Sequence, residues 1–289
     1  MNTEPRTFDL VYWISERYSI KLRKDKNDGP PWTGDPNMAT VRYCNVHRED
    51  DAVTKWFRAN WNNPDDGAWK FVLGRLINYV PTLASLLYYA DFDNVDFQGL
   101  AEGLKAVRAS GSKVFTSVYT ISTCGEQMDK IDYVIRLANM VAVHDQKGSW
   151  PWLPQGVPLM YPPKLAHAHE ALTTIPGLGD FLSGQVIADM KNTLGHPLNK
   201  ATDFYSWCAP GPGSLNGLKC FFPNRMITKT NFHAVMAECR ALVDPLVPLY
   251  IPRISAQDFQ NCLCEFSKHY RVKYEHGHVR NKYVPTSNH

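Results

Sequence analysis

The chain has 289 residues, of which 44% are hydrophobic and 20% charged, and these fractions are typical of an ordinary globular protein with a substantial core. No apolar run approaches the roughly 20 residues that cross a bilayer, and the first residues, MNTEPRTFDLVYW, lack an apolar core, so we expect no membrane span and no signal peptide. The net charge of +3 is too small to indicate nucleic-acid binding, so any DNA-binding surface must come from local clusters of basic residues.

Apolar residues recur at helical spacing through most of the chain and predict a mainly α-helical protein. The chain begins with an amphipathic helix at residues 8–21, a polar loop at 23–36 and a short extended or helical piece at 41–46. Further helices are predicted at residues 53–61, 69–76, 82–89, 99–109 and 128–143. Residues 116–120 have β-propensity, but one strand alone cannot build a sheet. A proline-rich passage at 150–163 indicates a connection between two halves, residues 1–160 and 161–289.

The second half opens with a glycine hairpin, IPGLG at residues 175–179, between amphipathic segments at 165–172 and 181–189. This pattern predicts a helix-hairpin-helix, in which glycines let the backbone approach a phosphate and the following helix presents free N–H groups. The alternative is an ordinary turn between packed helices, because P-G-x-G also makes simple turns. The residues predicted to contact DNA here are Gly177, Leu178, Gly179 and Ser183.

An acidic residue, Asp203, follows the hairpin region and begins the segment DFYSWCAPGPG. A carboxylate in a partly dry cleft can act as a general base, and Tyr205 can stack on a base. Asp203 can instead cap a helix or position a cationic substrate. The Pro-Gly-Pro-Gly stretch predicts an irregular backbone within a long loop at 204–230, and helices resume at residues 231–243 and 255–271.

Arginines and acids are concentrated in residues 23–50, around a single tryptophan. Arginine forks bind phosphate bidentately, and an exposed tryptophan can stack on an extruded base, although dense charge in a loop is often only solvated surface. The candidate ligands are Arg23, Trp32, Arg42, Asn45 and Arg48, and two further acids, Asp35 and Glu49, are candidate bases.

Basic residues alternate with tyrosines near the C-terminus, which suits a surface that tracks a nucleic-acid backbone. The residues concerned are Lys268, Arg271 and Lys273, continuing to Arg280, Lys282 and Tyr283. A disordered basic tail is the alternative for the last few residues. The H-x-H pairs lack a second ligand pair and no G-x-x-x-x-G-K-[ST] loop is present, so we expect neither a metal nor a cofactor. Seven scattered cysteines without a C-x-x-C pair favour a reducing, cytoplasmic compartment.

Several segments together resemble the alpha-glutamyl/putrescinyl thymine pyrophosphorylases, over residues 10 to about 283. The E-R-x-x-I-x-x-R and N-V-x-R-E-D signatures are the specific parts of this resemblance, whereas the glycine hairpin is shared by many DNA-binding proteins. The matching runs are ERYSIKLRKDKNDGPPWTGDP, RYCNVHREDD, GRLINYVPTLA, GSKVFTSVYTIST, IPGLGDFLSGQVIAD and TDFYSWCAPGPGSLNGL.

The resemblance implies a two-lobed helical fold related to helix-hairpin-helix DNA glycosylases, acting in phage DNA hypermodification in the cytoplasm of the infected host. An upstream kinase would phosphorylate 5-hydroxymethyluracil in double-stranded DNA, and this enzyme would displace the (pyro)phosphate with an amino acid or a polyamine. In that mechanism the base is flipped out, the arginines hold the leaving group, and Asp203, Asp35 or Glu49 deprotonates the amine.

Two other classes of function stay open. Glycosylases with lyase activity carry a lysine where this chain has Phe181, which disfavours strand cleavage through a Schiff base but not a monofunctional glycosylase. A catalytically silent DNA-binding module is the second alternative, and it would bind duplex DNA in a salt-sensitive manner without changing its mass.

Overall fold

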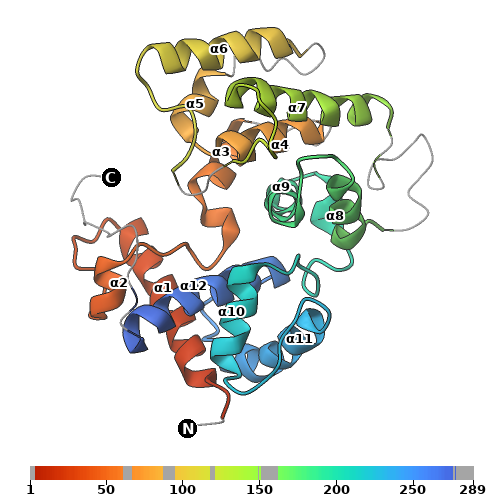
Figure 1. Cartoon of the computed structure of the whole chain (residues 1–289). Helices are drawn as coiled ribbons and strands as arrows, with labels where there is room; N and C mark the ends of the chain where they lie inside the picture. The colour runs from red at the N-terminus through yellow and green to blue at the C-terminus, as the bar shows by residue number, and fades with distance from the viewer. Residues whose placement is uncertain are drawn as a thin grey trace. The chain divides into compact units, whose positions relative to one another are not determined.

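The computed structural model (Figure 1) describes residues 4–60, 67–86, 95–117, 121–148, 150, 162–275 and 277. These residues form twelve α-helices and no β-strand, which confirms the predicted mainly α-helical class. None of the helices in the described part of the chain combines the length and apolarity that a membrane span needs. Residues 118–120 of the expected strand, most of the proline-rich passage, and Arg280, Lys282 and Tyr283 lie outside the described residues.

The chain divides into two compact units, neither of which ends near residue 160. The terminal unit comprises Met1–Asp51 and Tyr205–His289, and the central unit comprises Ala52–Phe204. The sequence placed the division at 160 because the proline-rich passage looks like a linker. The terminal unit is instead assembled from both ends of the chain, a long-range pairing that local composition does not reveal.

The central unit is built around a helix that is buried on every side. All ten residues of α4 (Ala68–Ile77) are buried, and α4 packs against α7 (Lys130–Gln146) and α9 (Asp180–Asn192). Eight of its ten residues are uncharged and mostly apolar, as expected for a helix at the centre of a helical core, and the exceptions are Lys70 and Arg75. The other helices of this unit are α3 (Ala52–Asn60), α5 (Val80–Ser85), α6 (Phe97–Ala109), α8 (Leu165–Thr173) and the 3-10 helix η3 (Pro197–Lys200).

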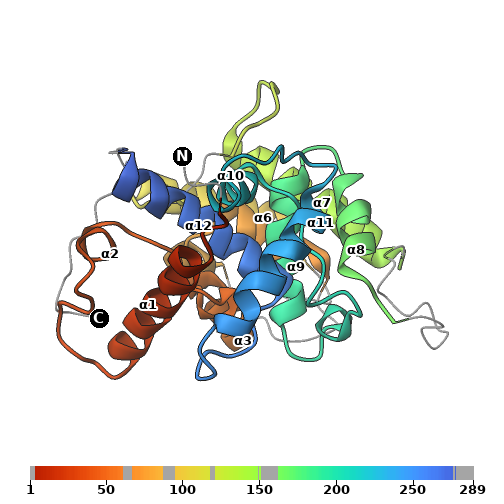
Figure 2. The same ribbon diagram turned by 90° about the horizontal axis from the view of Figure 1, so that it is seen from below.

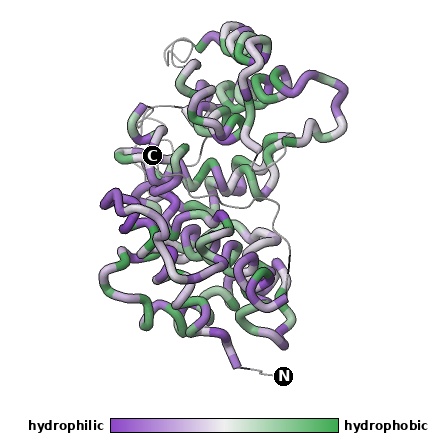
Figure 3. The backbone as a smooth tube through the Cα atoms, turned by 90° about the vertical axis from the view of Figure 1, so that its left-hand side faces the viewer, coloured by the Kyte–Doolittle hydropathy of each residue, from purple (hydrophilic) through white to green (hydrophobic). Residues whose placement is uncertain are grey.

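The terminal unit is centred on α12 (Ala256–Tyr274), which packs against α1 (Thr7–Asp25) and α10 (Pro212–Phe221). Figure 3 shows hydrophobic and hydrophilic residues alternating along the helices, as amphipathic helices require. The core of the unit contains Trp13, Phe221, Phe259 and Phe266. The remaining elements are α2 (Pro36–Thr40), η1 (Arg48–Asp50), α11 (Phe232–Val243) and η4 (Asp244–Leu246).

One helix lies within a segment that the sequence predicted to be a long loop. Residues 212–221 form α10, although Pro212, Gly213 and Gly217 weaken its helical signal. The two glycines face α12, where a Cβ atom on Gly217 would overlap the backbone of Leu263. The glycines are therefore required by close helix packing. The predicted loop is wrong for residues 212–221, whereas residues 222–230 lie between helices as expected.

Candidate functional site

The glycine hairpin joins α8 to α9 as predicted, and Gly177 is essential to its geometry. Gly177 has a φ of +96°, and a Cβ atom there would lie 2.6 Å from the Tyr133 hydroxyl and 2.9 Å from a Leu137 methyl on α7. Gly179 has a φ of −83°, precedes α9 and faces open space. Gly177 is thus fixed by backbone conformation and packing, whereas Gly179 leaves room for an approaching ligand.

The side chains of the hairpin divide between core and surface. Leu178 and Ser183 are buried, so neither side chain is placed to contact DNA. The Ser183 hydroxyl has no hydrogen-bond partner among the described residues. Phe181, in the first turn of α9, is 52% exposed. Among these residues, only backbone N–H groups are therefore suited to bind a phosphate, and Phe181 offers an exposed apolar ring beside them.

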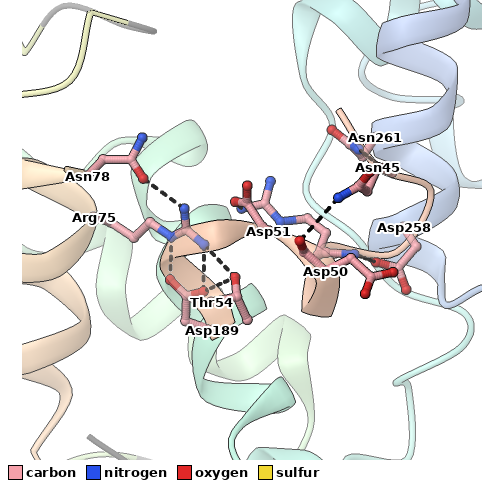
Figure 4. A network of polar contacts seen from close by, with 10 residues as sticks. Asn45, Asp50, Asp51, Thr54, Arg75, Asn78, Asp189, Asp258 and Asn261 are labelled. Atoms are coloured by element: carbon pink, nitrogen blue, oxygen red, sulfur yellow. Dashed lines mark hydrogen bonds and ion pairs between the residues drawn. The ribbon is translucent and has the colours of Figure 1, made fainter. Parts of the chain in front are cut away.

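A buried ion pair holds α9 in the central unit. Arg75 on α4 binds both carboxylate oxygens of Asp189 on α9, and the exposed fractions of the two side chains are 2% and 0%. Thr54 on α3 donates to Asp189 at 2.8 Å, and Arg75 donates to Asn78 at 3.0 Å (Figure 4). Sequence reasoning missed this network, although charged residues within the apolar runs KFVLGRLI and VIADM are a signal of it.

Asp203 caps a helix instead of facing open solvent. Its two carboxylate oxygens accept backbone N–H groups of Leu165 and Ala166 at 2.7 and 3.0 Å, in the first turn of α8. A negative charge is favourable at this end of a helix. The sequence suggested a cap for the following helix, whereas the capped helix is α8, which begins 38 residues before Asp203. A catalytic role for Asp203 stays a prediction.

The loop around Trp32 in the terminal unit is held closed by its own side chains. Arg23 donates to the Trp32 carbonyl and pairs with Glu16 at 3.2 Å. The Trp32 indole donates to the Asp28 carbonyl at 2.6 Å, and the Lys24 ammonium lies 4.3 Å from the indole ring. In this arrangement, Arg23 and Trp32 stabilise the conformation of the loop, and a ligand would have to displace these contacts.

The two other candidate bases lie on short helices of the terminal unit. Asp35 caps α2 by accepting from the backbone of Asn37 and Met38 at 2.8 and 2.9 Å. Tyr12 also donates to Asp35 at 3.1 Å, and partial burial together with this carboxylate raises the pKa of Tyr12 to about 12. Glu49 is exposed on η1. A catalytic role for either acid stays a prediction.

The E-R-x-x-I-x-x-R and N-V-x-R-E-D signatures meet at an extended segment, residues 41–47, that runs beside α1. Arg17 is buried and donates to the Cys44 carbonyl at 2.8 Å and to the Asn45 side chain at 2.7 Å. Asn45 in turn donates to the Asp50 carbonyl at 3.1 Å (Figure 4). Asn45 and Arg17 therefore fix the backbone of this segment. Arg17 is absent from the predicted site, although it lies inside the first signature.

Helix α12 holds the other side of the same segment. Glu265 accepts from the Cys44 backbone at 3.1 Å, and Asp258 accepts from the Arg48 backbone at 2.8 Å. The Arg48 guanidinium lies 3.6 Å from Asp51 and is 12% exposed. Two of its donors are buried without a hydrogen bond among the described residues. Arg48 is thus largely buried beside Asp51, and these two donors are not accessible to a ligand in this arrangement.

The remaining predicted residues lie on the surface of the terminal unit. Arg42, Arg271 and Lys273 are exposed, whereas Lys268 donates to the Arg42 carbonyl at 2.9 Å and pairs with Glu265 at 2.7 Å. Tyr205 is 40% exposed, and the Arg253 guanidinium lies 3.8 Å from its ring. Lys268 has a structural role, whereas Arg42, Arg271 and Lys273 are accessible to a ligand.

The predicted site residues divide between the two units. The hairpin residues and Asp203 belong to the central unit, and all the other predicted residues belong to the terminal unit. Within the described ranges, no group of three or more His, Cys, Asp or Glu side chains is placed to hold a metal ion. The structure therefore offers one candidate surface in each unit, the hairpin in the central unit and the exposed basic residues of α12 in the terminal unit.

The described residues form a helical protein with a glycine hairpin in one unit and a basic helix in the other, and comparison with known proteins gives the family. The family described as "5-hmdU DNA kinase, helical domain" matches residues 4–278, and the chain belongs to it. A 5-hmdU DNA kinase of Bacillus phage SP10 is 25% identical over 240 residues, which cover 73% of this chain and 36% of that protein. The chain thus spans about a third of the relative it matches. No solved structure matches.

The family match corrects the function expected from the sequence. The assignment to the thymine pyrophosphorylases is wrong, and with it the transferase that displaces (pyro)phosphate with an amine. The comparisons also give no support to a glycosylase-like character. The expected context of DNA modification is retained, because the family is that of the kinase which the sequence analysis placed one step upstream.

Proposed function

We propose that this chain is the DNA-binding part of a kinase that phosphorylates 5-hydroxymethyluracil in DNA. The observation that supports the proposal most directly is the family match, which covers nearly the whole chain and carries the words "helical domain". The SP10 relative is named for the same kinase activity and extends well beyond the matched region. The chain would therefore recognise the modified DNA and present the hydroxymethyl group for phosphoryl transfer.

The proposed reaction sets the requirements for this chain. The hydroxymethyl oxygen attacks the terminal phosphorus of a nucleoside triphosphate, the bond to the leaving diphosphate breaks, and the hydroxyl proton passes to a base or to water. Positioning and neutralisation of charge supply most of the catalysis in such transfers. The chain contains no G-x-x-x-x-G-K-[ST] loop, so we assign nucleotide binding to another part of the kinase and DNA positioning to this one.

Two features of the chain support DNA positioning. The hairpin exposes backbone at Gly179 beside the first turn of α9, which is the geometry that accepts a phosphate. The terminal unit exposes Arg42, Arg271 and Lys273, which can neutralise further phosphates. The substituent at the 5-position of the pyrimidine lies in the major groove, where a protein distinguishes the hydroxymethyl group from a methyl group by hydrogen bonding.

A binding experiment tests the proposal. Fluorescently labelled duplexes of one sequence, carrying thymine or 5-hydroxymethyluracil at one position, are titrated with the full chain at fixed salt. We expect salt-dependent binding of both duplexes and tighter binding of the 5-hydroxymethyluracil duplex, because a hydroxyl adds a hydrogen bond worth about 1 kcal/mol. Absence of duplex binding, or equal affinity for the two duplexes, would contradict recognition of the modified base.

A further inference from the structure

Helices α1 and α12 pack together in the terminal unit (Figures 1 and 2), and both carry aromatic and basic residues. Each helix contributes two aromatic residues one turn apart, Phe8 and Tyr12 on α1 and Tyr270 and Tyr274 on α12. Residues so spaced lie on the same side of a helix. We call this group, with Arg6, Arg271 and Lys273, the tyrosine–lysine face.

Contacts between the side chains show that the face is continuous. The Lys273 ammonium lies 5.6 Å from the Tyr12 ring centre and 5.0 Å from that of Tyr274, so it lies close to rings of both helices. The centres of the Tyr270 and Tyr274 rings are 4.8 Å apart. The Arg6 guanidinium lies 4.4 Å from the Tyr270 ring. Cations and rings therefore alternate across the surface.

Three of the four aromatic residues of this face are exposed, whereas Tyr270 is partly buried and packs against the core. Phe8 is 80% exposed, Tyr274 46% and Tyr12 44%. The nearby acids are engaged by tyrosine hydroxyls, since Tyr274 donates to Asp9 at 3.4 Å and Tyr12 donates to Asp35 at 3.1 Å. These hydrogen bonds leave the carboxylates charged, so the face carries acids as well as the exposed cations Arg271 and Lys273.

We propose that the tyrosine–lysine face binds an unpaired strand of DNA. Exposed rings alternating with cations form the arrangement that binds single strands, in which bases stack on the rings and phosphates pair with the cations. A duplex keeps the faces of its bases inside the stack and cannot use the rings in this way. A purely apolar partner would take the exposed charges of Arg271 and Lys273 out of water, so these two cations favour a polyanion.

This surface is distinct from the hairpin, which belongs to the central unit. It also requires no modified base. A DNA-modifying protein that opens a duplex around its target base creates an unpaired strand, and a surface for that strand would hold the opened region in place. The proposal is therefore tested with unmodified DNA, and its failure would leave the proposed kinase function untouched.

The test measures binding of a fluorescein-labelled oligothymidylate to the full chain by anisotropy, beside the same strand in a duplex with oligoadenylate. The face variants are Phe8→Ala with Tyr274→Ala, and Lys273→Glu alone. The control variants carry substitutions in the terminal unit at positions outside the tyrosine–lysine face. Leu249→Ala removes the fully exposed side chain of Leu249, and Lys229→Glu makes the same change of charge at an exposed lysine.

We expect the unmodified chain to bind the single strand more tightly than the duplex. The affinity of the double aromatic variant for the single strand should fall about fivefold or more, because the bases lose the rings on which they stack. Its affinity for the duplex should change little, because paired bases do not stack on these rings. Lys273→Glu should weaken binding and reduce its salt dependence. Equal affinity for single strand and duplex, or losses in the control variants that match those in the face variants, would overturn the proposal.

Discussion

The Arg75–Asp189 pair shows how strongly one buried residue can constrain the candidate site. Removal of one partner leaves an uncompensated charge in the core, which typically costs about 3–5 kcal/mol. We therefore expect Asp189→Ala to lower the free energy of unfolding by that amount, as measured by denaturant titration. Because Asp189 lies on α9, the hairpin should lose its support with it.

The matched control for this prediction is a pair at the surface. Lys105 and Asp132 lie 2.7 Å apart, but their side chains are 45% and 41% exposed. Lys105→Ala should change the free energy of unfolding by less than about 1 kcal/mol, because exposed pairs contribute little. Similar losses for Asp189→Ala and Lys105→Ala would contradict the structural role of the buried pair.

The two glycines of the hairpin should respond differently to alanine. Gly177→Ala introduces a side chain at a φ of +96° and against Tyr133, so we expect a loss of roughly 1–3 kcal/mol in unfolding free energy. Gly179→Ala meets open space at an ordinary φ and should cost less than about 1 kcal/mol. Thermal unfolding of the two variants compares them directly. The hairpin geometry would be contradicted if Gly179→Ala were the more damaging substitution.

At the scale of the element, Asp203 stabilises the start of α8. Asp203→Ala removes the acceptor of two backbone N–H groups and should cost roughly 1–2 kcal/mol, whereas Asp203→Asn keeps one acceptor and should cost less. Circular dichroism during denaturant titration gives both values. An Asn variant as unstable as the Ala variant would show that one remaining acceptor does not stabilise α8 and would contradict this prediction.

Helices with a strong local pattern were predictable, and one with a tertiary origin was not. Residues 69–76 and 165–172 have apolar residues at regular spacing, and α4 and α8 form there within one or two residues of the predicted bounds. Helix α10 is different, because Gly213 and Gly217 lower its propensity in exchange for close packing on α12. This packing depends on α12, which is more than forty residues further along the chain, so the local sequence pattern of α10 does not indicate it.

At the scale of the whole molecule, the signatures that suggested a family describe the fold and not the chemistry. Arg17 and Asn45, from the two signatures, hold the backbone of residues 41–47, and Arg23 closes the Trp32 loop. Residues with such roles are expected in any relative that shares the fold, whichever reaction it supports. The sequence could therefore indicate DNA modification while the reaction itself was predicted wrongly.

The stability of the whole chain should also depend on pH through a buried histidine. His196 accepts the Leu198 backbone N–H at the start of η3, and burial lowers its pKa to about 4. Between the folded pKa of about 4 and the ordinary value of about 6.5, the unfolded chain binds a proton that the folded chain does not. The free energy of unfolding therefore falls as the pH decreases through this window, by about 3 kcal/mol in total. Above pH 6.5 His196 is neutral in both states, and this loss does not occur.

His196→Asn separates this titration from the role in η3, because asparagine can also cap a helix but does not titrate. Denaturant titrations of both proteins at several pH values between neutrality and pH 4 give the comparison. We expect the slope of unfolding free energy against pH to be smaller in the variant, by up to about 1.4 kcal/mol per pH unit. Burial of His269 lowers its pKa as well, so the variant should keep part of the acid sensitivity. Identical slopes for the two proteins would show that His196 is not buried in its neutral form.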